Sequence, residues 1–282
     1  MLTAISLIRT HFLRKGFEMD GTRVILAAHR GDRERCPENT LPAFESALRF
    51  GVDMIETDVH MTKDGHLIIM HDRNLKRTAG YDGLTYEMCL PEIRTLDAGA
   101  WFSKEFAGTR VPTLEEFIAL IKDTDVLINW ELKDYPCHVG DEFAFSAADK
   151  LIAAIREHGL EKRSMINSFS DRVLEHVYRT YGKAFPLHGQ GIYHCQRTRD
   201  AATVSQEELY DWCCLYPNTA GYTPMDFPEN FAYCADHGIL PCVCVPDELD
   251  TYRRYVELGC RMFTSNNIYK AGEILKALNL RG

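Results

Sequence analysis

The chain has 282 residues, of which 45% are hydrophobic and 26% charged, with a formal net charge of -9. The length suits two small domains or one large single-core domain, and the sequence contains no apolar run long enough to cross a bilayer. The negative charge disfavours nucleic acid and anionic membranes as partners, so we expect a small-molecule substrate.

Residues 1–20 are expected to form an N-terminal extension. Their short apolar stretch precedes the cations Arg9, Arg14 and Lys15, which is the reverse of the order in a secretory signal. We therefore expect a cytoplasmic location and reduced cysteines. The ten cysteines include no Cys-x-x-Cys pair, so we interpret them as small buried hydrophobic residues and disfavour a cysteine-based metal site.

The first strand is predicted at Val24 to Ala28, a continuous apolar run typical of a strand that is buried on both faces. It ends in the polar residues His29 and Arg30. A helix capped by Asn39 or Thr40 follows, and Gly51 ends it. We therefore expect functional polar side chains at the carboxyl end of this strand.

The second strand carries two acids on one face. Side chains alternate along a strand, so Glu56 and Asp58 are expected to point together. The Asp64-Gly65 pair predicts a two-residue hairpin turn, because both residues tolerate positive φ. The returning segment is expected to bring His71 level with the two acids.

A loop-rich stretch follows the hairpin. We predict that residues 72–112 form a small insertion over one end of the core, because this stretch is longer than a connection requires. A capped helix is expected at 113–122, and a third strand at 126–133. Alternation places Asn129, Glu131 and Lys133 on one face of that strand.

The rest of the chain repeats the strand and helix pattern. Strands are predicted at 164–168, 185–190, 211–216, 240–245 and 261–264, and helices near 142–158, 171–181, 228–237, 248–258 and from about 271. With the hairpin return set aside, this gives eight strands separated by helices, which predicts an α/β fold of the (β/α)₈ TIM-barrel type. A doubly wound open sheet is less favoured, because the first strand lacks a glycine-rich turn.

Such a barrel would gather these polar side chains at the carboxyl ends of its strands. Glu56, Asp58 and Glu131 would offer an all-oxygen ligand set, which suits one divalent cation such as Mg²⁺ or Ca²⁺. Arg30 and Lys133 could then neutralise an anionic group. His29 and His71 have the side chain most often used for general acid and base chemistry.

The order of these motifs resembles the glycerophosphodiester phosphodiesterase family, one of the TIM-barrel phosphodiesterases. The likeness is dense from Ala28 to Lys133 and thins afterwards. It rests on His29-Arg30-Gly31, Pro37-Glu38-Asn39-Thr40, Ile55-Glu56-Thr57-Asp58-Val59, Asp64-Gly65, His71-Asp72, Leu96-Asp97-Ala98-Gly99, Val111-Pro112-Thr113-Leu114-Glu115-Glu116 and Glu131-x-Lys133, with Asn167-Ser168-Phe169 and Phe263-Thr264-Ser265-Asn266 as fainter matches.

The resemblance implies a metal-dependent hydrolase that cleaves glycerophosphodiesters to glycerol 3-phosphate and an alcohol. It assigns metal binding to Glu56, Asp58 and Glu131, acid and base roles to His29 and His71, and phosphate binding to Arg30 and Lys133, with Glu38 orienting one of these groups. The barrel domain is expected to span residues 21–282.

Several alternatives stay open at this stage. Cys244-Val245-Pro246-Asp247 replaces an aromatic segment that is usual in the family, so the substrate could be a lysophospholipid or a cyclic phosphodiester. A non-catalytic phosphate-binding module is also possible, and Glu131 could simply pair with Lys133. The remaining histidines are interpreted as structural, although His188 could reach the substrate together with Gln190. The oligomeric state is not predicted.

Overall fold

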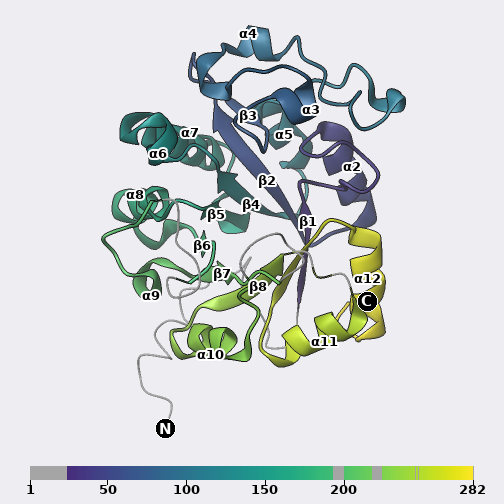
Figure 1. The fold of residues 1–282 in the computed structure, drawn as a ribbon, viewed down its shortest axis with the longest axis vertical. Helices are drawn as coiled ribbons and strands as arrows, with labels where there is room; N and C mark the ends of the chain where they lie inside the picture. The colour runs from purple at the N-terminus through teal and green to yellow at the C-terminus, as the bar shows by residue number, and fades with distance from the viewer. Residues whose placement is uncertain (1–23, 193–199, 218–223, 245, 247, 282) are drawn as a thin grey trace.

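The fold is a closed barrel of eight parallel strands, seen in a computed structural model that describes residues 24–192, 200–217, 224–244, 246 and 248–281. A ninth strand, β3, pairs antiparallel with β2 outside the ring (Figure 1). The strands are β1 (Ile25–His29), β2 (Met54–Met61), β3 (Leu67–Ile69), β4 (Leu127–Leu132), β5 (Ser164–Ser168), β6 (Leu187–Gly189), β7 (Trp212–Cys214), β8 (Leu240–Cys244) and β9 (Met262–Ser265).

Strand β1 closes the ring. Its residue Ala28 is in register with Ile55 of β2 on one side and with Ser265 of β9 on the other. The order β1-β9-β8-β7-β6-β5-β4-β2 therefore returns to its start. The predicted (β/α)₈ fold is confirmed. The seven barrel strands whose bounds were predicted lie within those bounds or one residue beyond them, and β2 carries Glu56 and Asp58 as predicted.

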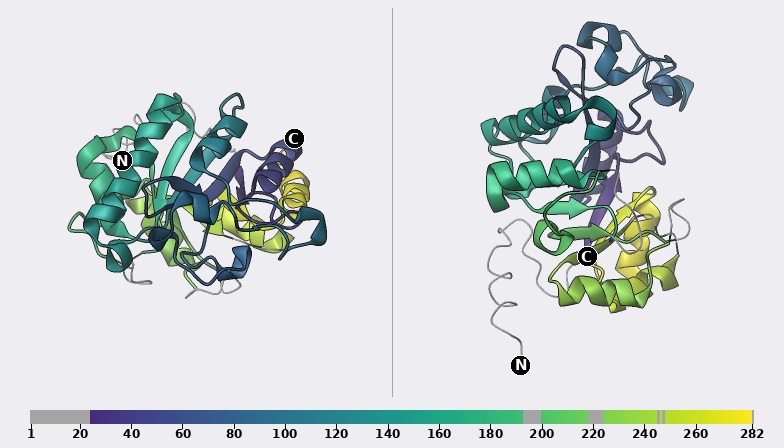
Figure 2. Two further views of the ribbon diagram at one scale, coloured as in Figure 1. Left: turned by 90° about the horizontal axis from the view of Figure 1, so that it is seen from above. Right: turned by 60° about the vertical axis from the view of Figure 1, so that its left-hand side comes forward.

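Helices surround the barrel, as the two further views also show (Figure 2). The α-helices are α2 (Leu41–Phe50), α3 (Lys76–Ala79), α4 (Leu90–Ile93), α5 (Leu114–Ile121), α6 (Pro136–Val139), α7 (Asp141–Glu157), α8 (Asp171–Tyr181), α9 (Gln206–Leu209), α10 (Pro228–Asp236), α11 (Leu249–Glu257) and α12 (Ile268–Ala277). Short 3₁₀ helices are η1 (Thr85–Glu87), η2 (Lys104–Phe106), η3 (Glu161–Arg163) and η4 (Gly182–Ala184).

Aromatic side chains join the barrel to its outer helices. Trp130 points outward from β4, and its ring centroid lies 5.4 Å from that of Phe117 on α5. Phe117 in turn lies 4.5 Å from Phe44 on α2. All three rings are fully buried, so α2, α5 and β4 share one apolar layer. Burying each ring contributes roughly 1.5–3 kcal/mol relative to exposure, and this layer fixes β4 with its polar residues facing inward.

The hairpin after β2 differs from the expected two-residue turn. Thr62 and His66 close a three-residue loop, in which the Thr62 amide donates to the His66 carbonyl at 2.8 Å. Gly65 has φ +82°, whereas Asp64 is not among the residues with positive φ. This is a turn followed by a left-handed glycine, a common three-residue hairpin geometry. The Asp64 carboxylate instead accepts hydrogen bonds from the Thr62 hydroxyl and the Leu90 amide.

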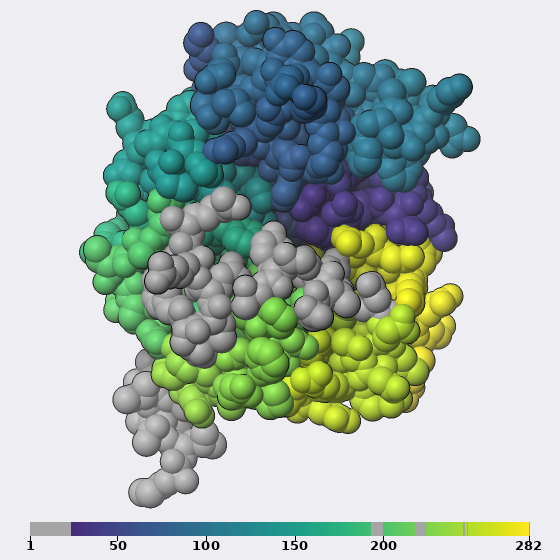
Figure 3. Space-filling model, viewed as in Figure 1, coloured from purple at the N-terminus to yellow at the C-terminus, as the bar shows by residue number. Residues whose placement is uncertain are grey.

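Residues 72–112 have a small hydrophobic cluster of their own. It is distinct from the main core and consists of Ile68, Met70, Leu75, Ala79, Ile93, Ala98 and Val111. Side chains alternate across β3, so Leu67 and Ile69, which flank Ile68, belong to the main core instead. In the space-filling view this segment, coloured blue, forms the upper part of the molecule beside α2 (Figure 3).

A few elements differ from prediction. Helix α12 begins at Ile268, three residues earlier than expected, because the Asn267 side chain caps it by accepting from the Lys270 amide. The short helices α6 and α9 were not predicted. The predicted extension at 1–20 lies outside the described residues, as do positions 245 and 247. No helix in the described ranges has the length and apolar character needed to span a membrane.

Candidate active site

The carboxyl end of β1 forms a tight turn that places His29 and Arg30 at the barrel mouth. Arg30 has a positive φ of 59°, and its amide donates to the Glu56 backbone oxygen at 3.0 Å. Gly31 follows with φ +81°, and a Cβ at this position would lie 2.8 Å from the Ala43 backbone. Only glycine accommodates both the backbone conformation and the close approach of α2.

Three buried carboxylates meet across β2 and β4. Glu56 and Asp58 lie on β2, and Asp58 is in register with Glu131 of β4. One carboxylate oxygen from each residue lies within 4.8 Å of the other two. The three acids that alternation placed on one side of the barrel are therefore brought together.

The acids have different electrostatic surroundings. Burial, together with the Asp58 and Glu131 carboxylates, raises the pKa of Glu56 well above its ordinary value. Burial also acts to raise the pKa of Asp58, but Lys133, His71, Arg30 and a hydrogen bond from Asn39 together hold that pKa below its usual range. Asp58 is thus the paired acid of the group, and Glu56 is the acid for which the protein supplies too little positive charge.

Two cations adjoin these acids. Arg30 Nε lies 3.3 Å from Asp58 Oδ2, and Lys133 Nζ lies 3.3 Å from Asp58 Oδ1. Lys133 Nζ also donates to Glu131 Oε1 at 2.7 Å. Burial lowers the pKa of the Lys133 ammonium, but Glu131, Tyr135 and Asp58 outweigh this and raise it well above its ordinary value. The predicted pairing of Glu131 with Lys133 therefore exists alongside the acid group.

The two predicted histidines lie beside the acids. His29 Nε2 is 3.9 Å from Glu56 Oε2, and His29 Nδ1 is 2.5 Å from Asn266 Oδ1. Burial, with the guanidinium groups of Arg30 and Arg33, lowers the pKa of His29 well below its usual value. His71 follows β3, and its Nδ1 lies 2.5 Å from Asp72 Oδ1. Each ring is thus oriented through its Nδ1.

Glu38 links the turn after β1 to the segment that follows His71. Its buried carboxylate pairs with Arg30 at 2.8 Å, Arg33 at 2.9 Å and Arg77 of α3 at 2.7 Å. Burial alone would raise its pKa, but the three guanidinium groups lower it to about 2. Arg77 also pairs with Asp72 at 2.7 Å. Glu38 therefore belongs to one network of ion pairs that reaches both the segment after His29 and the segment after His71.

The pair His60 and Asp134 was not singled out from the sequence. His60 Nδ1 lies 2.6 Å from Asp134 Oδ1, and both side chains are buried. His60 Nε2 lies 3.3 Å from the backbone oxygen of His71. The available signal was alternation, which places His60 on the same face of β2 as Glu56 and Asp58, but the partner is 74 residues away.

A pocket of about 390 Å³ opens at this mouth. Of the predicted site residues it is lined by His29, Arg30, Glu56, His71 and Glu131. His188 and Gln190, which were considered as substrate contacts, also line it. Lys133 borders an adjoining pocket that shares His71 and Asp72 with the first. Asp58 has no exposed surface and is not among the residues that line either pocket.

The acid group fits a hard divalent cation. Carboxylate oxygens are the ligands that such ions prefer, and a 4.8 Å separation is no larger than about twice a typical Ca²⁺–oxygen distance of about 2.4 Å. Asp58 Oδ1 is buried and faces Lys133 Nζ at 3.3 Å, but it accepts no hydrogen bond of acceptable geometry from the described residues. The raised pKa of Glu56 also indicates that positive charge is missing here, which a cation would supply.

Comparison with known proteins places this site in context. Residues 29–219 match the Glycerophosphoryl diester phosphodiesterase family. A glycerophosphodiester phosphodiesterase of Caldanaerobacter subterraneus subsp. tengcongensis is 43% identical over 241 residues, which cover 84% of this chain and 91% of that protein. One from Bacillus subtilis is 36% identical over 180 residues, which cover 58% of this chain and 59% of that protein.

Solved structures share the fold. The glycerophosphodiester phosphodiesterase of Agrobacterium tumefaciens superposes with a TM-score of 0.69 at 24% identity, over 88% of this chain and 99% of that chain. An Oleispira antarctica phosphodiesterase, solved with its product sn-glycerol-3-phosphate, has a TM-score of 0.75 at 22% identity, over 89% of this chain and 96% of that chain. At these identities the likeness establishes the barrel fold.

Proposed function

The chain belongs to the glycerophosphoryl diester phosphodiesterase family, and from this premise we propose that it hydrolyses glycerophosphodiesters to glycerol 3-phosphate and an alcohol. The observation that carries the proposal is the convergence of three buried carboxylates, two cations and two histidines at the mouth of the barrel. The named activity of the relative that is 43% identical supports the same reaction.

Glu56, Asp58 and Glu131 are the residues that would hold a divalent cation, Mg²⁺ or Ca²⁺. When bound, such an ion supplies positive charge that balances the buried acids and the substrate phosphate. Arg30 and Lys133 lie beside the same acid group, so both would also add positive charge near a phosphodiester bound at the barrel mouth. A guanidinium can hold phosphate oxygens in a bidentate manner, which fixes the phosphorus for attack.

The two histidines supply proton transfer. In the proposed step an oxygen nucleophile, either water or a neighbouring glycerol hydroxyl, forms a bond to phosphorus while the bond to the departing alcohol oxygen breaks. Attack by water gives glycerol 3-phosphate directly, whereas attack by the hydroxyl gives a cyclic phosphodiester that water then opens to glycerol 3-phosphate. One imidazole accepts the proton of the nucleophile, and the other donates a proton to the departing oxygen. In both rings Nδ1 is held by a neighbour, His29 by Asn266 and His71 by Asp72, so Nε2 is the nitrogen left for substrate.

The test is an assay of the purified full-length protein with glycerophosphocholine, glycerophosphoethanolamine and lysophospholipids, with Mg²⁺, Ca²⁺ or a chelator. We expect metal-dependent release of glycerol 3-phosphate. His29→Ala and His71→Ala should each lower kcat by about 10²–10⁴-fold. His66→Ala, which removes an exposed ring from the hairpin, serves as the matched control.

The assay separates the alternatives. Cleavage of lysophospholipids alone, which releases the headgroup alcohol and an acylated glycerol phosphate, would reassign the substrate. Binding of a phosphodiester without cleavage under any metal condition would favour a phosphate-binding module and overturn the proposed activity.

A further inference from the structure

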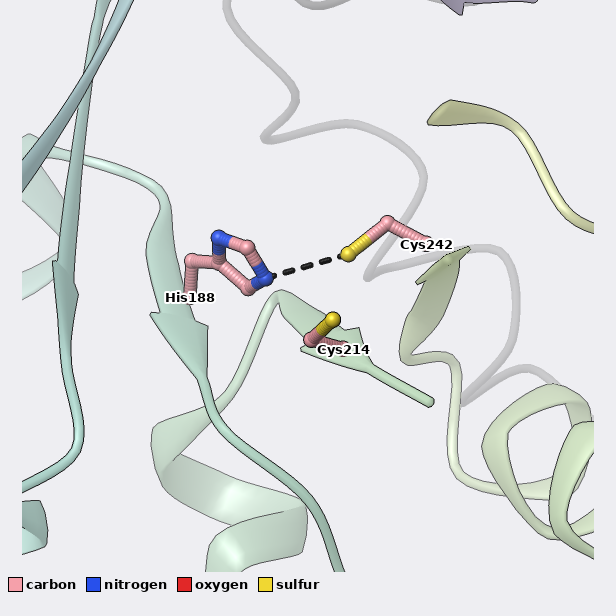
Figure 4. Close-up of side chains that lie close together, drawn as sticks. All are labelled: His188, Cys214 and Cys242. Carbon is pink, nitrogen blue, oxygen red and sulfur yellow. Dashed lines mark hydrogen bonds between the residues drawn. The ribbon is translucent and has the colours of Figure 1, made fainter. Parts of the chain in front are cut away.

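A second group of metal-binding side chains lies across the barrel from the acids. His188 of β6, Cys214 of β7 and Cys242 of β8 come from three consecutive strands, and one ligand atom from each lies within 4.8 Å of the other two. The close-up shows the imidazole and both sulfur atoms directed at one point (Figure 4). Cys242 Sγ lies 3.1 Å from His188 Nε2.

Strand register accounts for this convergence. Cys214 and Cys242 are partners across β7 and β8, and His188 is the partner of Trp212, two residues before Cys214. Since residues two apart share a face, all three side chains point to the barrel interior. Cys244 follows Cys242 by two residues, so its thiol lies on the same side of β8.

The group is buried yet reachable. Each of His188, Cys214 and Cys242 is at most 2% exposed. However, His188, Cys214 and Cys244 also line the mouth pocket. An ion could therefore enter from that pocket without opening the barrel.

We propose that His188, Cys214 and Cys242 form a second cation site, selective for a thiophilic ion such as Zn²⁺. Sulfur and imidazole ligands favour zinc-like ions, whereas the carboxylate group on β2 and β4 favours Mg²⁺ or Ca²⁺. The two walls of one pocket thus differ in the class of cation they select.

Asn129 supports the required orientation of the imidazole. Its Nδ2 lies 3.1 Å from His188 Nδ1, and its Oδ1 is buried and accepts no hydrogen bond from the described residues. A half turn of this amide lets Oδ1 accept a hydrogen bond from Nδ1–H. The Nε2 lone pair then faces the two sulfur atoms, which is the usual arrangement around a metal-bound histidine.

Cys260 provides the contrast expected of a purely structural cysteine. It is as buried as Cys242, but its thiol donates to the Met262 backbone oxygen, and it does not belong to the three-residue group. Serine in its place can keep that hydrogen bond. Cys260→Ser is therefore a matched control for a buried thiol in the same barrel.

The test is a Co²⁺ titration of the chelator-stripped full-length protein with excess Mg²⁺ present. We expect a sulfur-to-cobalt charge-transfer absorption that saturates at one equivalent and that Zn²⁺, but not Mg²⁺, removes. Cys214→Ser and Cys242→Ser should each abolish the absorption, whereas Cys260→Ser and Glu56→Gln should retain it. Retention in Glu56→Gln separates this site from the acid group and from the proposed hydrolysis.

Absence of the absorption in the wild-type protein would overturn the proposal, whatever the variants do. Its persistence in both Cys214→Ser and Cys242→Ser would do the same. Circular dichroism of each metal-free variant checks that the barrel is folded. Should a serine variant fail that check, native mass spectrometry of the wild-type protein and Glu56→Gln decides: one retained zinc ion in both supports the site, and none overturns it.

Discussion

His60 and Asp134 form a buried pair whose side chains meet at 2.6 Å, at the point where β2 and the segment after β4 come together. The other ring nitrogen of His60 lies 3.3 Å from the backbone oxygen of His71. Asp134 also accepts a hydrogen bond from the Met61 amide at 2.7 Å. The His60–Asp134 pair therefore contacts the backbone of a histidine that has a proposed role in proton transfer.

Asp134→Ala is expected to lower both stability and kcat. It leaves His60 and the Met61 amide without their buried partner, which costs about 1–3 kcal/mol. The resulting shift of His71 should lower kcat by roughly 10–100-fold. Urea unfolding and steady-state kinetics measure the two effects.

Asp149→Ala is the matched control for this pair. It removes the carboxylate of a more exposed pair, in which Asp149 Oδ1 lies 2.8 Å from His176 Nε2 on the outer helices α7 and α8. Exposed pairs contribute about 0–1 kcal/mol, and kcat should not change. An unchanged kcat in Asp134→Ala would contradict the positioning role.

Glu56→Gln and Asp58→Asn should have different effects on the free energy of unfolding of the metal-free protein. Glu56 faces two like charges, so its neutralisation is expected to leave the free energy of unfolding unchanged or higher. Asp58 balances Arg30 and Lys133, and its neutralisation should cost about 1–3 kcal/mol because each of these buried cations loses one of its two carboxylate partners.

Thermal melts with chelator and with Mg²⁺ or Ca²⁺ test both changes. Wild-type protein should melt at a higher temperature with the cation, and either substitution should remove most of that increase. Equal destabilisation by both substitutions without metal would contradict the electrostatic difference between the two acids.

Glu38 predicts a specific dependence of stability on acid pH. Its pKa falls from an ordinary 4.5 to about 2 on folding, so the stabilisation is fully present above pH 4.5 and is lost as the pH falls through about 2. The shift corresponds to about 3 kcal/mol at neutral pH. We expect Glu38→Gln to lower the free energy of unfolding by up to that amount and to flatten the acid part of the curve.

Glu45→Gln provides the comparison for Glu38. Glu45 is half-exposed on α2 and pairs with Arg49 at 3.7 Å, a spacing that contributes about 0.3–0.5 kcal/mol. Urea unfolding at pH 7, 4 and 3 gives the curves. Identical slopes for wild-type protein and Glu38→Gln below pH 4.5 would contradict the lowered pKa.

Alanine substitutions at Gly31 and Gly51 distinguish the energetic cost of backbone strain from the cost of steric crowding. Their φ values are +81° and +82°, but a Cβ on Gly31 would meet the Ala43 backbone at 2.8 Å, whereas one on Gly51 would contact nothing within 4 Å. Gly51→Ala should cost about 1–2 kcal/mol from the left-handed conformation alone. Gly31→Ala should cost more and should also lower kcat, since it moves the turn that carries His29 and Arg30. Equal unfolding free energies for the two variants would contradict this.

The sequence predicted the features that follow from local periodicity. Alternation along one strand was enough to place Glu56 and Asp58 on a common face, and the capping box at Thr113 and Glu116 marked the start of α5 correctly. The barrel followed from the succession of strands and helices, because parallel strands need such crossovers.

Features that depend on partners distant in the sequence were not predictable. Asp134 is 74 residues from His60, and Cys242 is 54 residues from His188. Each pair meets only because the barrel closes with one particular register. The same limit explains why the cysteines were interpreted as small buried hydrophobic residues. They form no short Cys-x-x-Cys motif in the sequence, and Cys214 and Cys242 approach His188 only through the pairing of different strands.

The separate apolar cluster beneath residues 72–112 has a consequence for local unfolding. Ile68 and Met70 pack in this small cluster just before His71, whereas Ile69 between them packs in the main core. Small clusters of this kind open at lower free energy than the global core. We expect backbone amides of Met70 and Leu75 to exchange with deuterium faster than those of Ile128 and Ile166, so that moderate heating would remove the His71 side of the pocket while the barrel itself stays intact.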